Sequence, residues 1–143
     1  HPFPGPLQVL STPLVADPAA GRDPDGEPQP SIVAVFDDGV DGSSELPTGV
    51  IRILDGRTCV QQAELGSLQL TSHSSPPAIA DLNGDRRPEI IAFQAGGGLV
   101  AFTFDMATSA WTVMWRSTAG GAPSSPTGSG LPLLHISEPP IPQ

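Results

Sequence analysis

Oxygen-bearing side chains recur at alternate positions between residues 81 and 89. They occupy positions 1, 3, 5 and 9 of this stretch and are Asp81, Asn83, Asp85 and Glu89. Calcium binds about six to eight oxygens from carboxylates, amides, backbone carbonyls and water. Gly84 allows the sharp turn that directs alternate side chains inward. The spacing predicts a calcium loop to which Arg87 contributes its backbone carbonyl and Glu89 both carboxylate oxygens; the alternative is a solvated acidic turn.

An earlier acidic stretch, residues 23–31, follows the same spacing. Its oxygen-bearing residues at positions 1, 3, 5 and 9 are Asp23, Asp25, Glu27 and Ser31. Ser31 stands where the later stretch has Glu89, so the bidentate carboxylate is lost. We expect a weaker calcium site here, supplemented by Asp17; the alternative is an acidic insertion loop that binds nothing.

Apolar segments flank both stretches and predict short strands. In the first unit they cover residues 13–17, 32–36, 49–56 and 59–63, and in the second 77–81, 90–93, 98–104 and 111–115. The 16 Gly and 18 Pro favour many turns, and no sustained helical spacing is present. Each unit therefore predicts a four-stranded antiparallel meander, which is typical of β-propeller blades.

The predicted organisation is all-β, with two blades of an incomplete propeller. Residues 1–66 form the first blade-like unit with a Pro-rich lead-in, and residues 67–119 form the second blade with its calcium loop. Residues 120–143 are rich in Pro, Gly and Ser, and are either a tail or the start of a third blade. Complete propellers have about four to eight blades. The chain is therefore a piece of a longer propeller, a subunit that closes a ring with others, or an open body whose Pro-rich ends cover the sheet edges.

The second unit resembles an FG-GAP or VCBS-type repeat, the blade of integrin-α-like β-propellers. The residues that carry this resemblance are Ala80-Asp81-Leu82-Asn83-Gly84-Asp85 and Pro88-Glu89-Ile90-Ile91, with Gly98-Leu99-Val100 and Trp115 fitting the later strands. The first unit, residues 12–63, matches more loosely. The resemblance implies calcium between the first two strands of a blade. Arg86 departs from the family, which often has Gly there.

Composition narrows the classes of partner. The net charge is −9, which is unfavourable for binding nucleic acid or an anionic membrane and suits cation binding. No run of 18 apolar residues exists, so no membrane span is expected.

The first residue is His1 and no signal peptide is visible, which suggests a mature, processed or excised chain. The single Cys59 is interpreted as a small buried residue in preference to a partner for an intermolecular disulfide.

The patterns favour a calcium-binding, secreted or cell-surface module for adhesion, assembly or protein interaction. The alternative is a carbohydrate-binding propeller, in which Trp111 or Trp115 stacks on sugar; Trp115 is the one expected to pack internally. Catalysis is not expected, because His73 and His135 are isolated and no zinc or phosphate-binding pattern is present. A non-catalytic piece of a polysaccharide-acting enzyme is a further alternative.

Overall fold

Two antiparallel sheets make up the folded part of the chain. The computed structural model describes residues 9, 11–17, 29–37 and 48–117, and the statements below concern these ranges. The first sheet contains β1 (Leu14–Ala16), β2 (Ser31–Phe36), β3 (Thr48–Asp55) and β4 (Gln61–Glu64) in chain order, with β5 (Thr71–Ser72) on β3. The second contains β6 (Ala78–Ala80), β7 (Glu89–Phe93), β8 (Leu99–Asp105) and β9 (Ala110–Arg116). Within these ranges, no helix is long and apolar enough to cross a membrane.

The all-β prediction is confirmed for the described residues, and each of the eight predicted apolar segments overlaps a strand. The predicted hairpin turn at residues 96–98 joins β7 to β8, and Gly96, Gly97 and Gly98 all have positive φ angles of 88°, 111° and 83°. Gly98 could not be replaced easily, since a Cβ there would lie 2.4 Å from the carbonyl oxygen of Ser117. The proposed start of a third unit lies outside the described residues.

The strands of the two sheets pair in the same register. Ala16 pairs with Ser31 at the start of β2, and Ala80 pairs with Glu89 at the start of β7. The register between the third and fourth strands shifts at Ile53/Leu54 in the first sheet and at Ala101/Phe102 in the second. These positions correspond when Ser31 is aligned with Glu89, as the spacing of the acidic stretches suggests.

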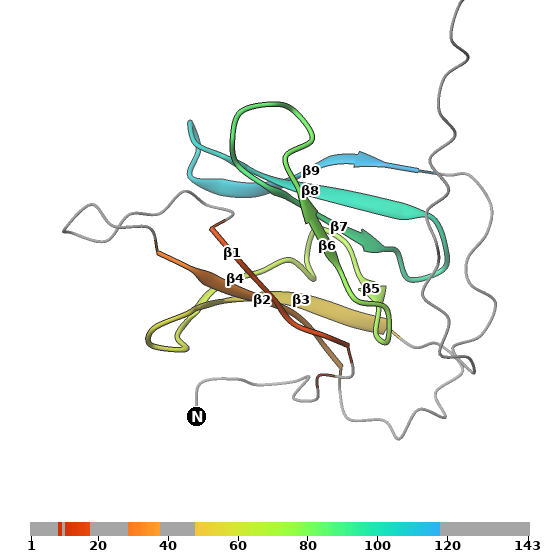
Figure 1. Cartoon of the computed structure of the whole chain (residues 1–143). Coiled ribbons are helices and arrows are strands. Elements are labelled where there is room, and N and C mark those ends of the chain that lie inside the picture. The colour runs from red at the N-terminus through yellow and green to blue at the C-terminus, as the bar shows by residue number, and fades with distance from the viewer. Residues whose placement is uncertain (1–8, 10, 18–28, 38–47, 118–143) are drawn as a thin grey trace, which may run out of the picture.

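One apolar core lies between the two stacked sheets (Figure 1). The first sheet contributes Val33, Val35, Ile51 and Ile53, and the second contributes Ile90, Ala92, Val100 and Phe102. All eight side chains are at most 3% exposed. Alternate residues of a strand point to opposite faces, so each sheet presents one face to the core. Burial of these aliphatic and aromatic groups is the main force that holds the sheets together.

A short strand that the sequence did not predict links the two sheets. Thr71 of β5 pairs with Gly49 of β3 and forms an isolated bridge to Gln94, directly after β7. Its hydroxyl donates a hydrogen bond of 3.1 Å to the Gly49 carbonyl oxygen. The neighbouring Leu70 carbonyl accepts a hydrogen bond of 3.0 Å from the Ala95 amide. Residues 70–71 therefore bond to both sheets at once.

The β3–β4 and β8–β9 hairpins share a turn built on Asp-x-x-Thr. Asp55 accepts hydrogen bonds from the Thr58 amide and hydroxyl, at 2.7 and 2.9 Å, and Asp105 accepts one of 2.8 Å from the Thr108 hydroxyl. The next residue adopts positive φ in both turns, 57° at Cys59 and 52° at Ser109. Cys59 is exposed, so its interpretation as a buried residue was wrong. Cys59 lies in the turn and not in a strand, because β4 begins only at Gln61.

Candidate metal site

The loop between β6 and β7 is centred on a buried carboxylate. Glu89, the first residue of β7, is only 1% exposed. Its Oε2 accepts a hydrogen bond of 2.7 Å from the Leu82 amide, and its Oε1 accepts one of 3.0 Å from the Thr103 hydroxyl and one of 3.2 Å from Asn83 Nδ2. All three donors are neutral. An ionised carboxylate held this deeply by neutral donors carries a desolvation cost that a bound cation would offset.

The other two carboxylates shape the loop through its backbone amides. Asp81 accepts hydrogen bonds from the amides of Gly84 and Arg86, at 2.7 and 2.9 Å. Asp85 accepts one of 2.8 Å from the Arg87 amide. Gly84 and Arg86 have φ angles of +80° and +69°, so the loop turns twice through the left-handed region. The second turn explains why glycine suits the position of Arg86.

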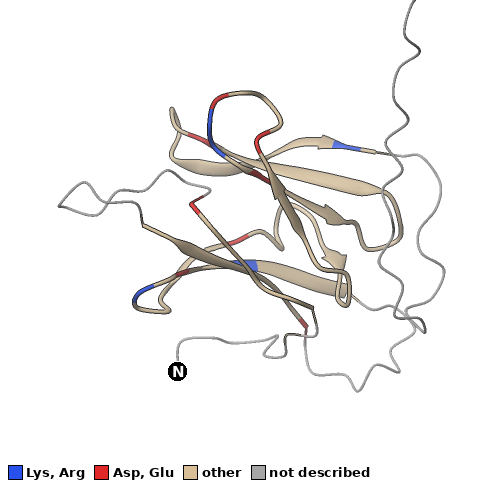
Figure 2. Cartoon of the chain, viewed as in Figure 1, with Lys and Arg blue, Asp and Glu red and all other residues tan. Residues whose placement is uncertain are grey.

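The amide of Asn83 lies between two carboxylates. Asn83 Nδ2 is 3.2 Å from Asp85 Oδ2 and 3.2 Å from Glu89 Oε1, while Asn83 Oδ1 accepts a hydrogen bond of 2.8 Å from the Asp85 amide. The structure thus links Asp81, Asn83, Asp85 and Glu89 by hydrogen bonds within and next to one loop, which projects from the second sheet in Figure 2 and carries both acidic (red) and basic (blue) residues. The predicted ligand from Arg87 is its backbone carbonyl oxygen. The hydrogen bond that the structure shows for Arg87 is instead donated by its backbone amide, to Asp85.

The donor set of the loop fits a hard cation. It comprises carboxylates and an amide oxygen, which calcium prefers and which soft metals do not. Among the described residues, no three His, Cys, Asp or Glu side chains converge closely enough to hold a metal ion. In the arrangement seen here, hydrogen bonds to backbone amides and to Asn83 occupy the carboxylates. In a calcium site Asn83 would bind through its side-chain oxygen, which here accepts a hydrogen bond from the Asp85 amide.

The first acidic loop is only partly visible. Asp17 directly follows β1, as Asp81 follows β6, and Ser31 begins β2, as Glu89 begins β7. Ser31 is 2% exposed, and its hydroxyl donates a hydrogen bond of 2.7 Å to Gln62 Oε1 on β4. The predicted ligands Asp23, Asp25 and Glu27 lie outside the described residues. The two ends of this loop therefore match those of the second loop. The Ser31 hydroxyl, however, is already hydrogen-bonded to Gln62 of β4.

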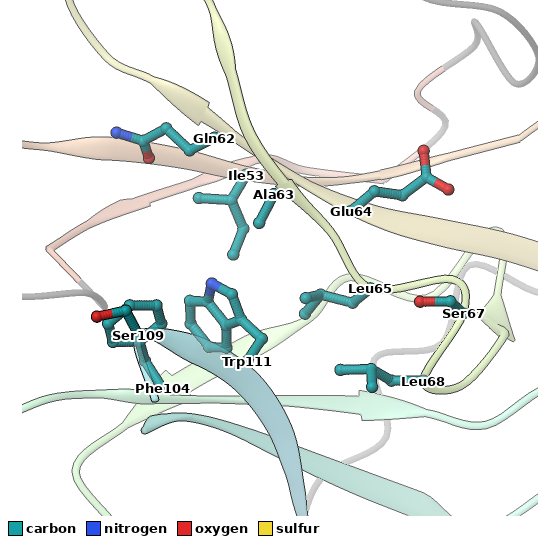
Figure 3. A pocket seen from close by; sticks show the side chains of 10 residues that line it. All are labelled: Ile53, Gln62, Ala63, Glu64, Leu65, Ser67, Leu68, Phe104, Ser109 and Trp111. Atoms are coloured by element: carbon teal, nitrogen blue, oxygen red, sulfur yellow. The ribbon is translucent and has the colours of Figure 1, made fainter. Parts of the chain in front are cut away.

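A second candidate site is the pocket between β4 and the β8–β9 hairpin. It has a volume of about 550 Å³, and Figure 3 shows Ile53 and Ala63 on one side with Trp111 and Phe104 on the other. The Trp111 and Phe104 rings meet edge to face, with centroids 5.6 Å apart. Glu64 also lines the pocket. Aromatic walls beside polar groups suit a small ligand with apolar and hydroxyl-bearing faces.

Trp115, which was expected to pack internally, is the more exposed of the two tryptophans. Trp111 packs against the core, whereas Trp115 is 38% exposed on β9. The bulge at Ala101/Phe102 lies between their pairing positions, so the two tryptophans lie on opposite faces of the sheet although they are four residues apart. Trp111 pairs with Phe104 and Trp115 pairs with Ala101.

The sequence also missed a buried acidic partner of His73. His73 Nδ1 lies 3.7 Å from Asp37 Oδ2, and these residues are 6% and 3% exposed. His73 Nε2 has no hydrogen-bond partner among the described residues. Within these residues it therefore does not hydrogen-bond to a hydroxyl or thiol that it could activate. Because 36 positions separate the two residues along the chain, no local pattern could have shown the contact.

Comparisons of the chain with models of protein families, with curated proteins and with solved structures found no match. The resemblance to FG-GAP and VCBS repeats accordingly depends on the loop and strand residues of this chain alone.

Proposed function

We propose that this chain is a calcium-stabilised β-propeller repeat module of the extracellular space, which serves adhesion, assembly or protein interaction. The observation that carries the proposal is the Glu89 carboxylate, which is 1% exposed and is hydrogen-bonded, among the described residues, to neutral donors: Leu82 and Asn83 in the loop and Thr103 on β8. Calcium would neutralise this group together with Asp81 and Asp85, with Asn83 and the Arg87 carbonyl completing the ligand set. Its role would be structural, since the loop fixes β6 against β7.

The shared strand register of the two sheets supports the blade interpretation. Each sheet is a meander of four sequential strands, and the acidic loop joins the first two strands in both. A single sheet of this kind cannot bury both faces, so blades stack around an axis in propellers. The partners implied are other blades or a protein that docks on them.

We place this module outside the cell because a weak calcium site of the kind proposed would be filled there. Extracellular calcium modules bind with dissociation constants of about 0.1–1 mM, which suits the calcium concentration outside cells. The exposure of Asp81 and Asp85 to solvent is consistent with binding in this range. The net charge of −9 adds a general attraction for cations.

Thermal unfolding in calcium and in EDTA tests the proposal. At about 10 mM calcium, a site of this strength adds roughly 1.4–2.7 kcal/mol to the free energy of unfolding. Glu89→Gln should remove most of that gain, because it keeps the shape of the side chain and deletes its charge. Ser31→Ala, at the corresponding position of the first sheet, is the matched control and should retain the gain.

The proposal is wrong if the melting temperature of the unaltered chain is the same in calcium and in EDTA. A calcium effect that survives Glu89→Gln but disappears on replacement of Asp23 and Asp25 would move the site to the first loop. Direct titration by calorimetry gives the number of ions bound and separates these two outcomes.

A carbohydrate-binding function is the second candidate, and the pocket beside Trp111 favours it. The pocket combines two aromatic rings with the polar side chains of Gln62, Glu64, Ser67 and Ser109. Sugar rings stack on aromatic faces while hydroxyl groups hydrogen-bond at the edge. A glycan array followed by titration of Gln62→Ala and Glu64→Ala would detect this activity; an array without binding removes the candidate.

A further inference from the structure

The last strand of the first sheet has a free edge. β4 lies at the end of that sheet, and among the described residues it pairs only with β3. Its residues Gln61, Gln62 and Glu64 are exposed, and Ala63 is half-buried. The backbone groups on the far side of such a strand are those with which an extended peptide pairs when it adds a strand to a sheet.

The pairing with β3 determines which backbone groups of β4 lie at this edge. The Leu65 amide donates a hydrogen bond of 2.9 Å to the Ile51 carbonyl oxygen, and Arg52 is paired with Glu64. Hydrogen-bonded and non-hydrogen-bonded pairs alternate along an antiparallel ladder. Leu65 and Ala63 therefore direct their amide and carbonyl groups to β3, whereas Glu64 directs both groups away from it, to the free edge.

The pocket of about 550 Å³ lies beside this edge, on the face of β4 to which Ala63 points (Figure 3). Ile53 and Leu65, each 1% exposed, line it together with Trp111. Ala63 is small and leaves the space unfilled, while the corresponding position of the second sheet holds Trp115. Residues opposite each other on antiparallel strands share a face. A residue added opposite Ala63 would therefore point into the pocket.

The other face of β4 carries a carboxylate next to the same edge. Glu64 Oε2 lies 3.3 Å from Arg52 Nε, and the Arg52 side chain is 2% exposed whereas that of Glu64 is 44% exposed. The exposed part of the carboxylate can accept a second cation from a residue added opposite Glu64. The net charge of −9 adds a general attraction for a basic peptide.

We propose that β4 binds an extended peptide as an added antiparallel strand, with a large apolar residue opposite Ala63 and a basic residue directly before it, opposite Glu64. The apolar side chain enters the pocket. The basic residue exchanges two backbone hydrogen bonds with Glu64 and pairs with its carboxylate. This inference specifies a partner for the protein-interaction part of the proposed function, on which it rests, and it is independent of calcium.

A peptide array tests the proposal on the full chain. Its members are about seven residues long, with Thr at every position except two adjacent central ones, which take all residue types in turn. Binding, measured by fluorescence polarisation in calcium and in EDTA, should be strongest for Arg or Lys followed by Phe, Leu or Trp. Thr in place of the apolar residue should weaken binding by about 10- to 100-fold, because the pocket is then unfilled.

Methylation of single backbone nitrogens of the best peptide tests strand addition without any change to the chain. On the basic residue, the methyl group removes the amide that donates to the Glu64 carbonyl oxygen, and binding should fall by about tenfold. On the apolar residue, the amide points away from β4, so the same methylation is the matched control and should leave binding nearly unchanged.

Variants of the chain test the pocket. Ala63→Trp fills it and should reduce binding to that of the peptide with Thr in place of the apolar residue. The matched control is Gln61→Trp, which places the same side chain on β4 at the residue that pairs with Leu54, on the face away from the core. This control should retain binding. The melting temperature of each variant shows whether it stays folded.

Loss of binding in Ala63→Trp but not in Gln61→Trp, with the expected difference between the two methylations, supports the proposal. Absence of binding by every peptide at about 1 mM overturns it, as do equal effects of the two methylations. Glycan binding that Ala63→Trp blocks, without peptide binding, overturns it in favour of the carbohydrate candidate. Peptide binding in EDTA by a chain whose melting does not respond to calcium would retain the peptide site and reject the calcium site.

Discussion

The loop after β1 and the loop after β6 begin and end at corresponding backbone positions, yet they place different chemistry there. Glu89 brings a buried carboxylate to the start of β7, where Thr103 donates to it at 3.0 Å. Ser31 brings a hydroxyl to the start of β2, and it donates to Gln62 at 2.7 Å. Both side chains are at most 2% exposed. The same buried position thus serves a charged centre in one sheet and a neutral strand-to-strand link in the other.

The difference shows that strand register and side-chain chemistry are specified separately. Alternating apolar residues and turn residues set the register, and they do so in both sheets despite few identical residues. Single positions set the chemistry. Arg52 in β3 corresponds to Val100 in β8, and one is an ion-paired group while the other lies in the core. Substitutions at corresponding positions should therefore have unequal effects.

The largest inequality is expected between Phe102 and Leu54, which occupy corresponding positions in the two sheets, one facing the core and the other facing away from it. Phe102 is fully buried between the sheets, and Phe102→Ala should cost about 3–5 kcal/mol of the free energy of unfolding. Leu54 is half-buried on the side away from the second sheet, and Leu54→Ala should cost about 1–2 kcal/mol. Urea denaturation measures both. Equal losses would contradict the placement of Phe102 in the core and of Leu54 on the side away from it.

A smaller inequality is expected between the two Asp-x-x-Thr turns in acid. The Thr58 amide and hydroxyl, with the Arg57 amide, lower the pKa of Asp55, and the Thr108 hydroxyl and Ala107 amide lower the pKa of Asp105. A lowered pKa in the folded state stabilises the protein above the unfolded value of about 3.9, and this stability is lost as the pH falls through the folded value.

Melting temperatures between about pH 2 and pH 6 test this effect. Asp55→Asn and Asp105→Asn should each flatten the fall below about pH 4. The Asp55 variant should flatten it more, because Gln29 also donates to that carboxylate. A pH profile that neither substitution changes would show that the turns do not contribute to acid sensitivity.

The smallest expected effect concerns the two left-handed residues of the second loop. Arg86→Gly should stabilise the folded chain by up to about 1 kcal/mol, because a φ of 69° is unfavourable for a residue with a side chain. Gly84→Ala should destabilise it by a similar amount, although open space surrounds the position, since only its φ of +80° opposes the change. Chemical denaturation in EDTA measures the contribution of backbone conformation to the free energy of unfolding in the absence of calcium. Changes of the same sign in the two variants would reject it.

Local patterns in the sequence predicted the strands and the two acidic loops that follow the first strand of each sheet. They did so because strand alternation, glycine turns and loop spacing act over a few neighbouring residues. The contacts that were missed depend on distant parts of the chain. Thr71 pairs with Gly49 and Gln94, and His73 approaches Asp37, without any motif that marks them. The positions of Trp111 and Trp115 depended on a bulge, which shifts the pattern by one residue.

The link at Thr71 has a consequence for how the molecule comes apart. Thr71 is fully buried, and its strand is hydrogen-bonded on one side to β3 and on the other to the segment after β7. Separating the sheets would break both sets of hydrogen bonds as well as the core. Opening of either sheet is thereby transmitted to the other through two residues of backbone. Unfolding should accordingly be a single cooperative event, in which neither sheet persists after the other is lost.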